Sequence, residues 1–233
     1  MSSSGERRMR ILALLAEGTP DLETARLCEV CADVSGMSGA GIMLMAPDLL
    51  AGSICTSDNV CALIEQLQYT LGEGPSVDAY QDQRPVLEPD LAYPVTPRWL
   101  AFSGPSLDAG VKAVFGFPIR VGAVRLGALN LYRDRPGSLT DDQHADSLVM
   151  ADIAARAVLV MQSNAPPGEL AKELESGASF QSVVHQATGM IAAQLDSSVG
   201  HALVRLRAYA FAHDQPLVEV AREVVARNLR FQQ

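Results

Sequence analysis

The 233-residue sequence predicts an α+β protein in two parts: an antiparallel sheet with flanking helices, followed by an all-helical bundle. Apolar residues alternate along 113–121, and a second apolar run follows at 124–133 across a tight turn, which is typical of an antiparallel strand pair. After the next helix comes a proline-rich break, and no strand pattern appears beyond it. We therefore expect a sheet-containing domain over 1–163, a linker over 164–177 and a helical domain over 178–233.

Local signals place the elements of the first part. Turn residues such as Pro47-Asp48 separate short extended runs, and the capping-box pattern Thr140-Asp-Asp-Gln143 opens a long helix. Pro118 has no amide donor, so we expect it at a sheet edge or bulge. The glycine-rich stretch 72–75 and the proline-rich stretch up to about residue 109 are interpreted as loops. The expected helices lie near 7–16, 19–36, 60–71 and 140–161, and the expected strands near 41–46, 52–56, 84–88, 113–121 and 124–133.

Three apolar stripes at helical spacing predict the C-terminal bundle. This part also differs in charge from the rest of the chain. Residues 178–233 hold five Arg and four acidic residues, which gives this part a net charge of +1. Since the whole chain carries −9, the rest of the chain carries −10. This difference in charge indicates two units with different partners. The stripes are Phe180, Val184, Ala187 and Ile191; Val199, Ala202, Leu203, Leu206 and Ala210; and Leu217, Val220, Ala221, Val224 and Leu229.

Composition excludes several classes of protein. With 48% hydrophobic and 19% charged residues the chain is not wholly disordered, and no apolar run approaches the roughly 18 residues of a membrane helix. The basic N-terminus (Arg7, Arg8 and Arg10) imitates a secretion signal, but its apolar stretch is short and Glu17 follows it. We interpret it as an amphipathic helix and expect a cytoplasmic protein without membrane contact. The overall acidity argues against indiscriminate nucleic-acid binding.

Neither a metal site nor a catalytic group is expected. Cys28-x-x-Cys31 has the spacing of half a zinc or redox site, but both residues fit the core stripe of their helix, and Cys55 and Cys61 lack matching knuckle spacing. Since the sequence shows no export signal, reduced core thiols are expected rather than disulfides. His144 has no nucleophile at a suitable spacing, and we interpret it as a solvated helix residue. The sequence therefore predicts no enzyme and no cofactor.

A basic and aromatic stripe stands out in the C-terminal part. His201, Arg205 and Tyr209 follow one another at intervals of four residues, on a different side of the helix from the apolar stripe. Arginine can bind phosphate and tyrosine can stack on an unpaired base, so the stripe is a candidate RNA surface. An ordinary solvated face remains the alternative. Arg207 lies on another, partly apolar side, where it could instead support packing against a helix or subunit.

The C-terminal part resembles the ANTAR domain, through the segments 184–191, 202–210 and 217–225 in order. That family consists of RNA-binding modules of bacterial antitermination regulators, which act as dimers on tandem short-loop hairpins. Thr188 departs from the pattern, because a lysine is common there. The resemblance and the stripe together give the candidate RNA-binding residues, which are Arg205, Arg207 and Tyr209, followed by His185, Thr188 and Arg222.

The N-terminal part resembles the GAF domain, through its element order and the segments 71–79, 84–86, 115–121 and 126–132. GAF domains are antiparallel-sheet sensors for small ligands or mediators of dimer contacts, and GAF followed by ANTAR is a familiar bacterial regulator arrangement. The sequence matches no cyclic-nucleotide signature, haem histidine or bilin-attachment motif, so the small-molecule ligand is unidentified.

These observations lead to one hypothesis and three rivals. The hypothesis is a homodimeric antiterminator whose ANTAR domain binds tandem hairpins in nascent RNA, with dimer contacts from the stripe around Val184, Ala187 and Ile191 and from the helix before Pro166. The first rival is a DNA-binding helix-turn-helix regulator, and the second is a thiol-dependent reductase of the GAF fold. The third is a GAF dimer whose tail binds protein alone.

Overall fold

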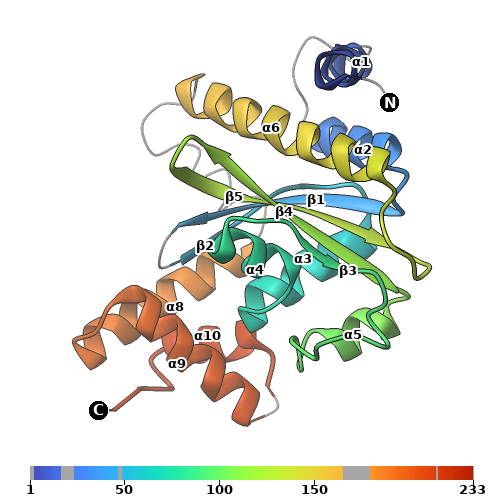
Figure 1. Cartoon of the computed structure of the whole chain (residues 1–233). Coiled ribbons are helices and arrows are strands. Elements are labelled where there is room, and N and C mark those ends of the chain that lie inside the picture. Colours follow the sequence, from blue (N-terminus) through green and yellow to red (C-terminus); the bar gives the residue numbers. More distant parts are fainter. Residues whose placement is uncertain (1–2, 17–23, 47–48, 165–178, 214, 233) are drawn as a thin grey trace. The chain divides into compact units, whose positions relative to one another are not determined.

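The computed structural model in Figure 1 describes most of the chain as two compact units. The first unit comprises residues 1–45 and 53–165, and the second comprises 46–52 and 166–233. The expected linker at 164–177 lies, apart from its first residue, outside the described residues, as does the expected start of a helix at Thr19-Pro20. The described residues are 3–16, 24–46, 49–164, 179–213 and 215–232.

A five-stranded sheet of order β2-β1-β5-β4-β3 is the centre of the first unit. β1 pairs antiparallel with β5, β5 with β4, and β4 with β3. The predicted alternating pair is the middle of this sheet, with Phe115 opposite Leu131 and Phe117 opposite Leu129. The strands are β1 Gly39–Ala46, β2 Leu49–Thr56, β3 Val86–Glu88, β4 Ala113–Val121 and β5 Val124–Arg133.

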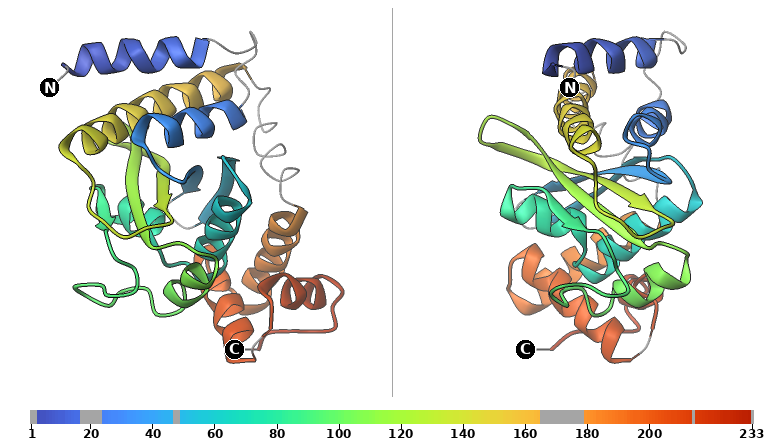
Figure 2. Two further views of the ribbon diagram at one scale, coloured as in Figure 1. Left: turned by 90° about the vertical axis from the view of Figure 1, so that its right-hand side faces the viewer. Right: turned by 45° about the vertical axis from the view of Figure 1, so that its right-hand side comes forward.

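Helices cover both faces of the sheet. α2 and α6 lie on one face, α3 and α4 lie on the other, and α1 packs on α6 and α2 on the side away from the sheet (Figures 1 and 2). This is the predicted α+β architecture. The helices of this unit are α1 Ser4–Ala16, α2 Thr24–Ser35, α3 Asn59–Leu71, α4 Pro75–Asp82, α5 Ser103–Asp108 and α6 Asp141–Asn164.

The predicted strand face forms the main core. Phe115, Phe117 and Ile119 of β4 are fully buried among apolar residues of β5, α2 and α6, whereas Val121 at the turn is exposed. Pro118 lies beyond the end of the short β3 ladder, which pairs only with residues 114–116 of β4, and next to a register shift at Ile119 and Arg120. On the β3 side, therefore, its missing amide donor removes no ladder bond, and the adjacent register shift agrees with the expected edge or bulge position.

The capping box is confirmed at the start of α6. The Thr140 hydroxyl accepts from the Gln143 amide (3.2 Å), and the Gln143 side chain accepts from the Thr140 amide (3.0 Å). These two bonds satisfy amides that a helix N-terminus otherwise leaves unpaired. Local sequence thus sets the start of the longest helix of the unit.

Two short helices were missed: one follows a stretch interpreted as a loop, and the other lies inside one. α4 begins at Pro75, directly after the glycine-rich segment, and α5 lies inside the proline-rich stretch. Glu73 explains how the first of these loops is held: its carboxylate accepts from the backbone amides of Ala101 (2.7 Å) and Phe102 (2.8 Å). The partners lie almost thirty residues away, beyond the reach of any local pattern.

The expectation of reduced cysteines is wrong for one pair. Cys28 of α2 and Cys55 of β2 form a disulfide, with a Cα–Cα distance of 6.0 Å. Cys31 and Cys61 are free thiols and are buried, as predicted. Packing of α2 against the sheet brings two residues 27 positions apart into bonding range, and spacing alone does not reveal that.

The second unit contains the three predicted helices, α8 Ser179–Leu195, α9 Val199–Ala212 and α10 Leu217–Val225. Most residues of the predicted apolar stripes form the core, whereas Val199 is exposed and Leu229 is partly exposed beyond the end of α10. Val184, Ala187 and Ile191 are fully buried within the single chain, so the expectation that they make dimer contacts is wrong. The same burial holds for α9 and α10, whose buried residues are Ala202, Leu203, Leu206, Ala210, Leu217, Val220, Ala221 and Val224.

Across the part of the chain that the structure describes, no helix is both long enough and apolar enough to span a bilayer.

Candidate RNA-binding surface

One side of α9 carries a column of polar and aromatic residues. His201, Arg205, Tyr209 and His213 follow one another at intervals of four residues, so they lie one above another along the helix and its C-terminal cap. Tyr209 is partly exposed, and the other three are exposed. Ser198 starts this helix, because its hydroxyl accepts from the His201 amide (3.2 Å). We call these four residues the α9 column.

An aromatic stack forms the C-terminal end of the α9 column. The rings of Tyr209 and His213 are stacked, with centroids 3.9 Å apart and planes 17° apart. The His213 Nδ1 atom also lies 2.8 Å from the Tyr209 carbonyl oxygen, which fixes the imidazole over the phenol ring. Phe231 meets Tyr209 edge-on at 5.4 Å. The three rings therefore make a preorganised aromatic platform at the surface.

The segment after α10 holds this platform in place. Its first residues close α10, because the amides of Asn228 and Leu229 both donate to the Glu223 carbonyl (2.9 and 3.1 Å). Further along, the Phe231 amide donates to the Gln194 side chain of α8 (2.9 Å). Arg205 donates to the Gln232 carbonyl at 3.5 Å, which uses only one of the five N–H donors of its guanidinium. The segment thus ties α8 and α9 together beside the α9 column.

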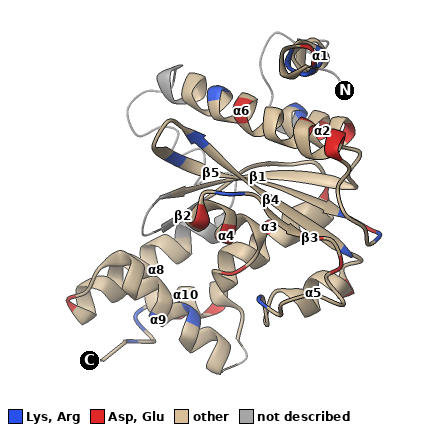
Figure 3. Ribbon diagram, in the orientation of Figure 1, with Lys and Arg blue, Asp and Glu red and all other residues tan. Residues whose placement is uncertain are grey.

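Figure 3 marks the Lys and Arg residues of the chain in blue, and two of those in the second unit, Arg207 and Arg222, are further candidate RNA contacts. Arg207 is two residues from Arg205, so the two side chains leave the helix about 160° apart, and Arg207 is only partly exposed. Arg222 on α10 is exposed and pairs with Glu219 (3.0 Å). That carboxylate would face phosphates if α10 entered a DNA groove, which disfavours the helix-turn-helix rival. His185 is partly exposed on α8.

Thr188 lies beneath the surface. Its side chain is fully buried, and its hydroxyl donates to the Val184 carbonyl one turn earlier (2.6 Å). A hydroxyl already satisfied inside the helix core has no route to a phosphate. The sequence placed Thr188 among the candidate RNA contacts, and the structure corrects this: the position belongs to the core.

Two residues of the aromatic platform were missed from the sequence. His213 lies four residues after Tyr209, so the spacing that revealed the stripe could also have extended it by one turn. Phe231 gives no such signal. It reaches Tyr209 only because the chain reverses after α10, where Arg227 adopts a left-handed conformation (φ 64°). Sequence periodicity cannot predict a contact that depends on this reversal.

The first unit contains a buried polar cluster under the sheet. Glu65 of α3 is 2% exposed, and neither of its carboxylate oxygens makes a hydrogen bond of acceptable geometry with the described residues. Asn130 of β5 is fully buried beside it and pairs in register with Gly41, where any side chain would collide with Glu65. Burial raises the pKa of the Glu65 carboxyl to about 8, and the Asn130 amide offsets only part of that rise.

Metal binding has no visible basis among the residues that the structure describes, since no group of three His, Cys, Asp or Glu side chains converges there. Burial also raises the pKa of the Cys31 and Cys61 thiols, and the nearby Glu65 and Asp58 carboxylates raise that of Cys61 further. A high thiol pKa disfavours the thiolate, which is the form that ligates metals and attacks substrates.

Comparison with protein-family models finds two domains. Residues 24–158 match the GAF domain and residues 172–225 match the ANTAR domain. The two matches agree with the sheet-containing first unit and the helical second unit. They favour neither the helix-turn-helix rival nor the reductase rival. No curated protein matches the chain.

Solved structures confirm the fold of the first unit. The GAF domain of a phosphoenolpyruvate-protein phosphotransferase from Acinetobacter superposes with a TM-score of 0.53 at 12% identity, covering 70% of this chain and 98% of that one. The corresponding domain from Coxiella burnetii gives a TM-score of 0.52 at 14% identity, with the same coverage of 70% and 98%. At such identities the likeness concerns the fold alone.

GAF domains are sensor or dimerisation domains, and ANTAR is an RNA-binding domain of antitermination regulators; both are regulatory rather than catalytic. The α9 column lies within the ANTAR match. The chain therefore belongs to the GAF family and combines its GAF domain with a following ANTAR domain, the arrangement of GAF-ANTAR regulators.

Proposed function

We propose that this protein is a cytoplasmic, homodimeric transcription antiterminator whose ANTAR domain binds tandem hairpins in nascent RNA and prevents a terminator from forming. The GAF domain receives the signal or pairs the subunits. The observation that carries the proposal is the α9 column, an exposed basic and aromatic surface in a domain of an RNA-binding family.

The chemistry of the α9 column suits a hairpin loop. Sequence-specific proteins recognise RNA mainly at loops, where unpaired bases stack on aromatic or guanidinium planes. The stacked Tyr209 and His213 rings offer such a platform, and Arg205 can reach a phosphate or a base edge one turn away. Since Phe231 and the segment after α10 already hold Tyr209, RNA binding costs little ordering of this side chain.

The experiment that tests the proposal is a gel-shift titration of the full chain with a tandem-hairpin RNA, a single hairpin and a duplex DNA of equal charge. Tight binding to the tandem RNA alone supports the antiterminator, because two bundles in a dimer would engage two hairpins together. Preference for the duplex would support the helix-turn-helix rival. Absence of binding to all three would contradict an RNA-binding role for the isolated protein.

A substitution at Gly189 tests whether α8 takes part in RNA binding. It lies exposed inside α8 with a helical backbone, and a Cβ atom added there would meet nothing within 4 Å. Replacing it by alanine is expected to stabilise the domain by about 0.5–1 kcal/mol. If RNA approaches this turn closely, Gly189→Ala also weakens RNA binding. Thermal melts measure the change in stability, and gel shifts of the same sample measure the change in RNA affinity. Higher stability with unchanged affinity would show that α8 is not part of the RNA interface.

The surface proposed for dimerisation is a groove of about 310 Å³ between α1 and α6. It is almost entirely apolar, lined by side chains such as Leu12 and Leu15 of α1 and Val160 of α6. Exposed apolar grooves of this kind commonly mark interaction sites. The occupant we propose is the same helix pair of a second copy, which would close the groove in an isologous dimer. The sequence-based expectation of dimer contacts on the helix before Pro166 is retained in this proposal.

Ion pairs hold α1 in position to form that groove. Arg7 is buried and bridges Asp142 and Asp146, and Arg10 also reaches Asp146 (2.9 Å). Arg8 pairs with Asp152 (2.8 Å) at the groove's edge. A buried arginine satisfied by two carboxylates fixes the helix register, because breaking one partner leaves an uncompensated charge. The groove is therefore a defined surface of the GAF unit.

Charges placed in the groove are expected to prevent dimerisation. Leu12→Asp with Val160→Asp would bring four carboxylates into a dry interface, where their desolvation is costly, so the variant should elute as a monomer at concentrations where the wild type is a dimer. Size-exclusion chromatography with light scattering measures this. The matched control is Val95→Asp with Leu100→Asp, at two exposed positions outside the groove, and it should remain a dimer. A dimeric groove variant would refute this interface.

A further inference from the structure

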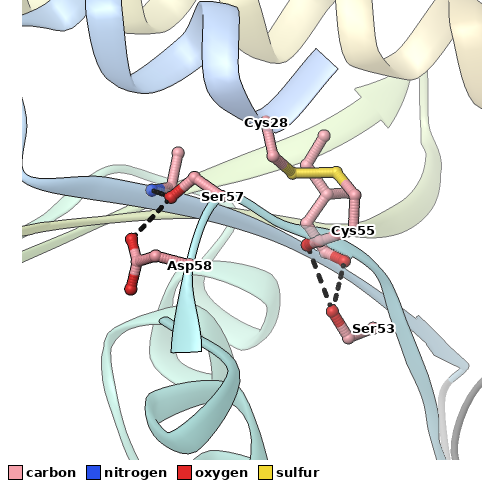
Figure 4. The surroundings of a disulfide bond; sticks show 7 residues. Cys28, Ser53, Cys55, Ser57 and Asp58 are labelled. Atoms are coloured by element: carbon pink, nitrogen blue, oxygen red, sulfur yellow. Dashed lines mark hydrogen bonds between the residues drawn. A yellow bond between two sulfur atoms is a disulfide. The ribbon is translucent and has the colours of Figure 1, made fainter. Parts of the chain in front are cut away.

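The disulfide lies in the first unit, here called the GAF unit, and joins a helix in the packed core to a strand at the edge of the sheet (Figure 4). Cys28 is on α2, which packs on α6 and shares the apolar core with the sheet, and it is fully buried. Cys55 is on β2, the edge strand, and 7% of it is exposed. An edge strand pairs on one side only, so it is among the parts of a sheet that open most easily. The bond therefore fastens a labile strand to a packed helix.

The redox state of the compartment in which the protein works bears on the role of this disulfide. A chain that carries an RNA-binding domain of antitermination regulators works where transcripts are made, and that compartment is reducing. Disulfides that do form there are usually transient, and catalytic or redox-sensing. The pair lies in the apolar core, and among the described residues no group of three metal-ligating side chains converges. This leaves sensing as the role that fits both the location and the chemistry.

We propose that Cys28 and Cys55 form a reversible redox site, oxidised by hydrogen peroxide and opened by a dithiol, through which the oxidation state changes the GAF unit. This rests on the proposed function only in naming the signal that the GAF domain receives. In the oxidation, one thiol reacts with peroxide to give a sulfenic acid and water. The second thiol then displaces a second water, so that two thiols and one peroxide yield one disulfide and two waters.

The direction of attack follows from burial. Cys55 is the partner with surface exposure, so peroxide, and later the reducing dithiol, are expected to react at its sulfur. In the reverse step the dithiol attacks Cys55, releases the Cys28 thiolate, and then closes into its own cyclic disulfide, so two electrons pass to the protein. A strand that opens locally provides the access that this exchange requires.

The other two cysteines serve as internal controls. Cys31 lies one turn after Cys28 on the same helix and is fully buried, and Cys61 on α3 is also fully buried. Burial raises the pKa of both thiols, and both are free cysteines, whereas Cys28 and Cys55 lie within bonding distance of each other. We expect oxidation to consume two thiols of the four and to leave Cys31 and Cys61 unchanged.

The experiment counts thiols in the full chain. The protein is reduced, freed of reductant, titrated with hydrogen peroxide, and then labelled with N-ethylmaleimide in denaturant for intact-mass and peptide analysis. We expect four labels before oxidation, two afterwards, and a linked peptide pair containing Cys28 and Cys55. A dithiol added under native conditions should restore four labels. Persistence of four labels after peroxide, a bond between other cysteines, or a bond that native dithiol cannot open would each overturn the proposal.

Stability supplies an independent readout. Since the bond closes a loop of 27 residues, oxidation is expected to raise the melting midpoint of the GAF unit by roughly 5–10 °C. Cys28→Ala and Cys55→Ala should abolish this shift, and Cys31→Ala should retain it. The wild type measured in both oxidation states keeps the test valid even if a variant folds poorly. An unchanged midpoint would overturn the claim that the bond alters the unit.

RNA affinity separates this proposal from the proposed function. If the redox state is the signal, oxidised and reduced protein should differ at least threefold in affinity for the tandem-hairpin RNA. Equal affinities in the two states would refute the regulatory role of the pair while leaving RNA binding established. Absence of RNA binding in both states would instead refute the proposed function, and the redox site would be judged by thiol count and melting midpoint.

Discussion

Replacing Arg205 and Tyr209 together by alanine is expected to weaken binding of the tandem-hairpin RNA about a hundredfold or more. Loss of a base-stacking aromatic costs about 1–3 kcal/mol, and loss of a hydrogen bond to a charged group costs about 1.5–3 kcal/mol. Both side chains belong to the α9 column, so one variant removes the proposed phosphate-binding group and the proposed stacking ring at once. Gel-shift titration measures the change. The salt dependence of binding should also become shallower, because fewer phosphates are neutralised.

Two control variants make this result specific. Tyr93→Ala with Arg120→Ala makes the same chemical change at exposed positions of the GAF unit and should leave RNA affinity unchanged. Tyr209→Phe keeps the ring that stacks on His213 and should retain most of the affinity, whereas a role for the hydroxyl would make it as weak as Tyr209→Ala. If the double variant melts like wild type and still binds RNA tightly, the α9 column is not the RNA surface.

Glu65→Gln is expected to remove a large pH dependence of stability from the GAF unit. The pKa of Glu65 is about 8 in the folded protein against an ordinary value of 4.5, because the carboxyl is buried. Between these values the folded state binds more protons than the unfolded state, so stability falls as the pH rises. The loss is about 1.4 kcal/mol for each pH unit and reaches several kcal/mol by pH 8. The loss of stability starts as the pH passes 4.5 and levels off above 8.

Denaturant unfolding at several pH values between 4.5 and 8 measures this effect. The difference in free energy of unfolding between the glutamine variant and the wild type should grow steadily across that range, since glutamine does not titrate. Glu29→Gln is the matched control, because it makes the same chemical change at an exposed side chain. A difference for Glu65→Gln that stays flat across that range would show that the buried carboxyl does not titrate as described.

Patterns formed by neighbouring residues predicted most of the elements correctly. The alternation of Phe115, Phe117 and Ile119 identified the central strand pair, and the Thr140 and Gln143 capping box located the start of α6. The i, i+4 spacing of Arg205 and Tyr209 revealed the column on α9. Each of these signals is encoded within a few residues, because hydrogen bonding and side-chain direction in helices and strands repeat over short distances.

The misses came from contacts between distant segments. α4 begins immediately after a glycine-rich loop, and that loop is held by bonds from Glu73 to amides almost thirty residues later. The sequence pattern around Thr188 does not show whether its side chain faces the surface or the core. Only the packing of the three helices buries it. Glu65 shows no local sign of its raised pKa, because the burial comes from the sheet packed against α3.

The sequence by itself determined the α+β class, the succession of a sheet domain and a three-helix domain, and the resemblance to GAF and ANTAR. These follow from periodicity, caps and turn residues, which act locally. Only the tertiary structure decided that Cys28 meets Cys55, that Phe231 joins Tyr209, and that Glu65 is buried beside Asn130. Such pairings depend on how whole elements pack, and the free energy of that packing is shared among many residues far apart in the chain.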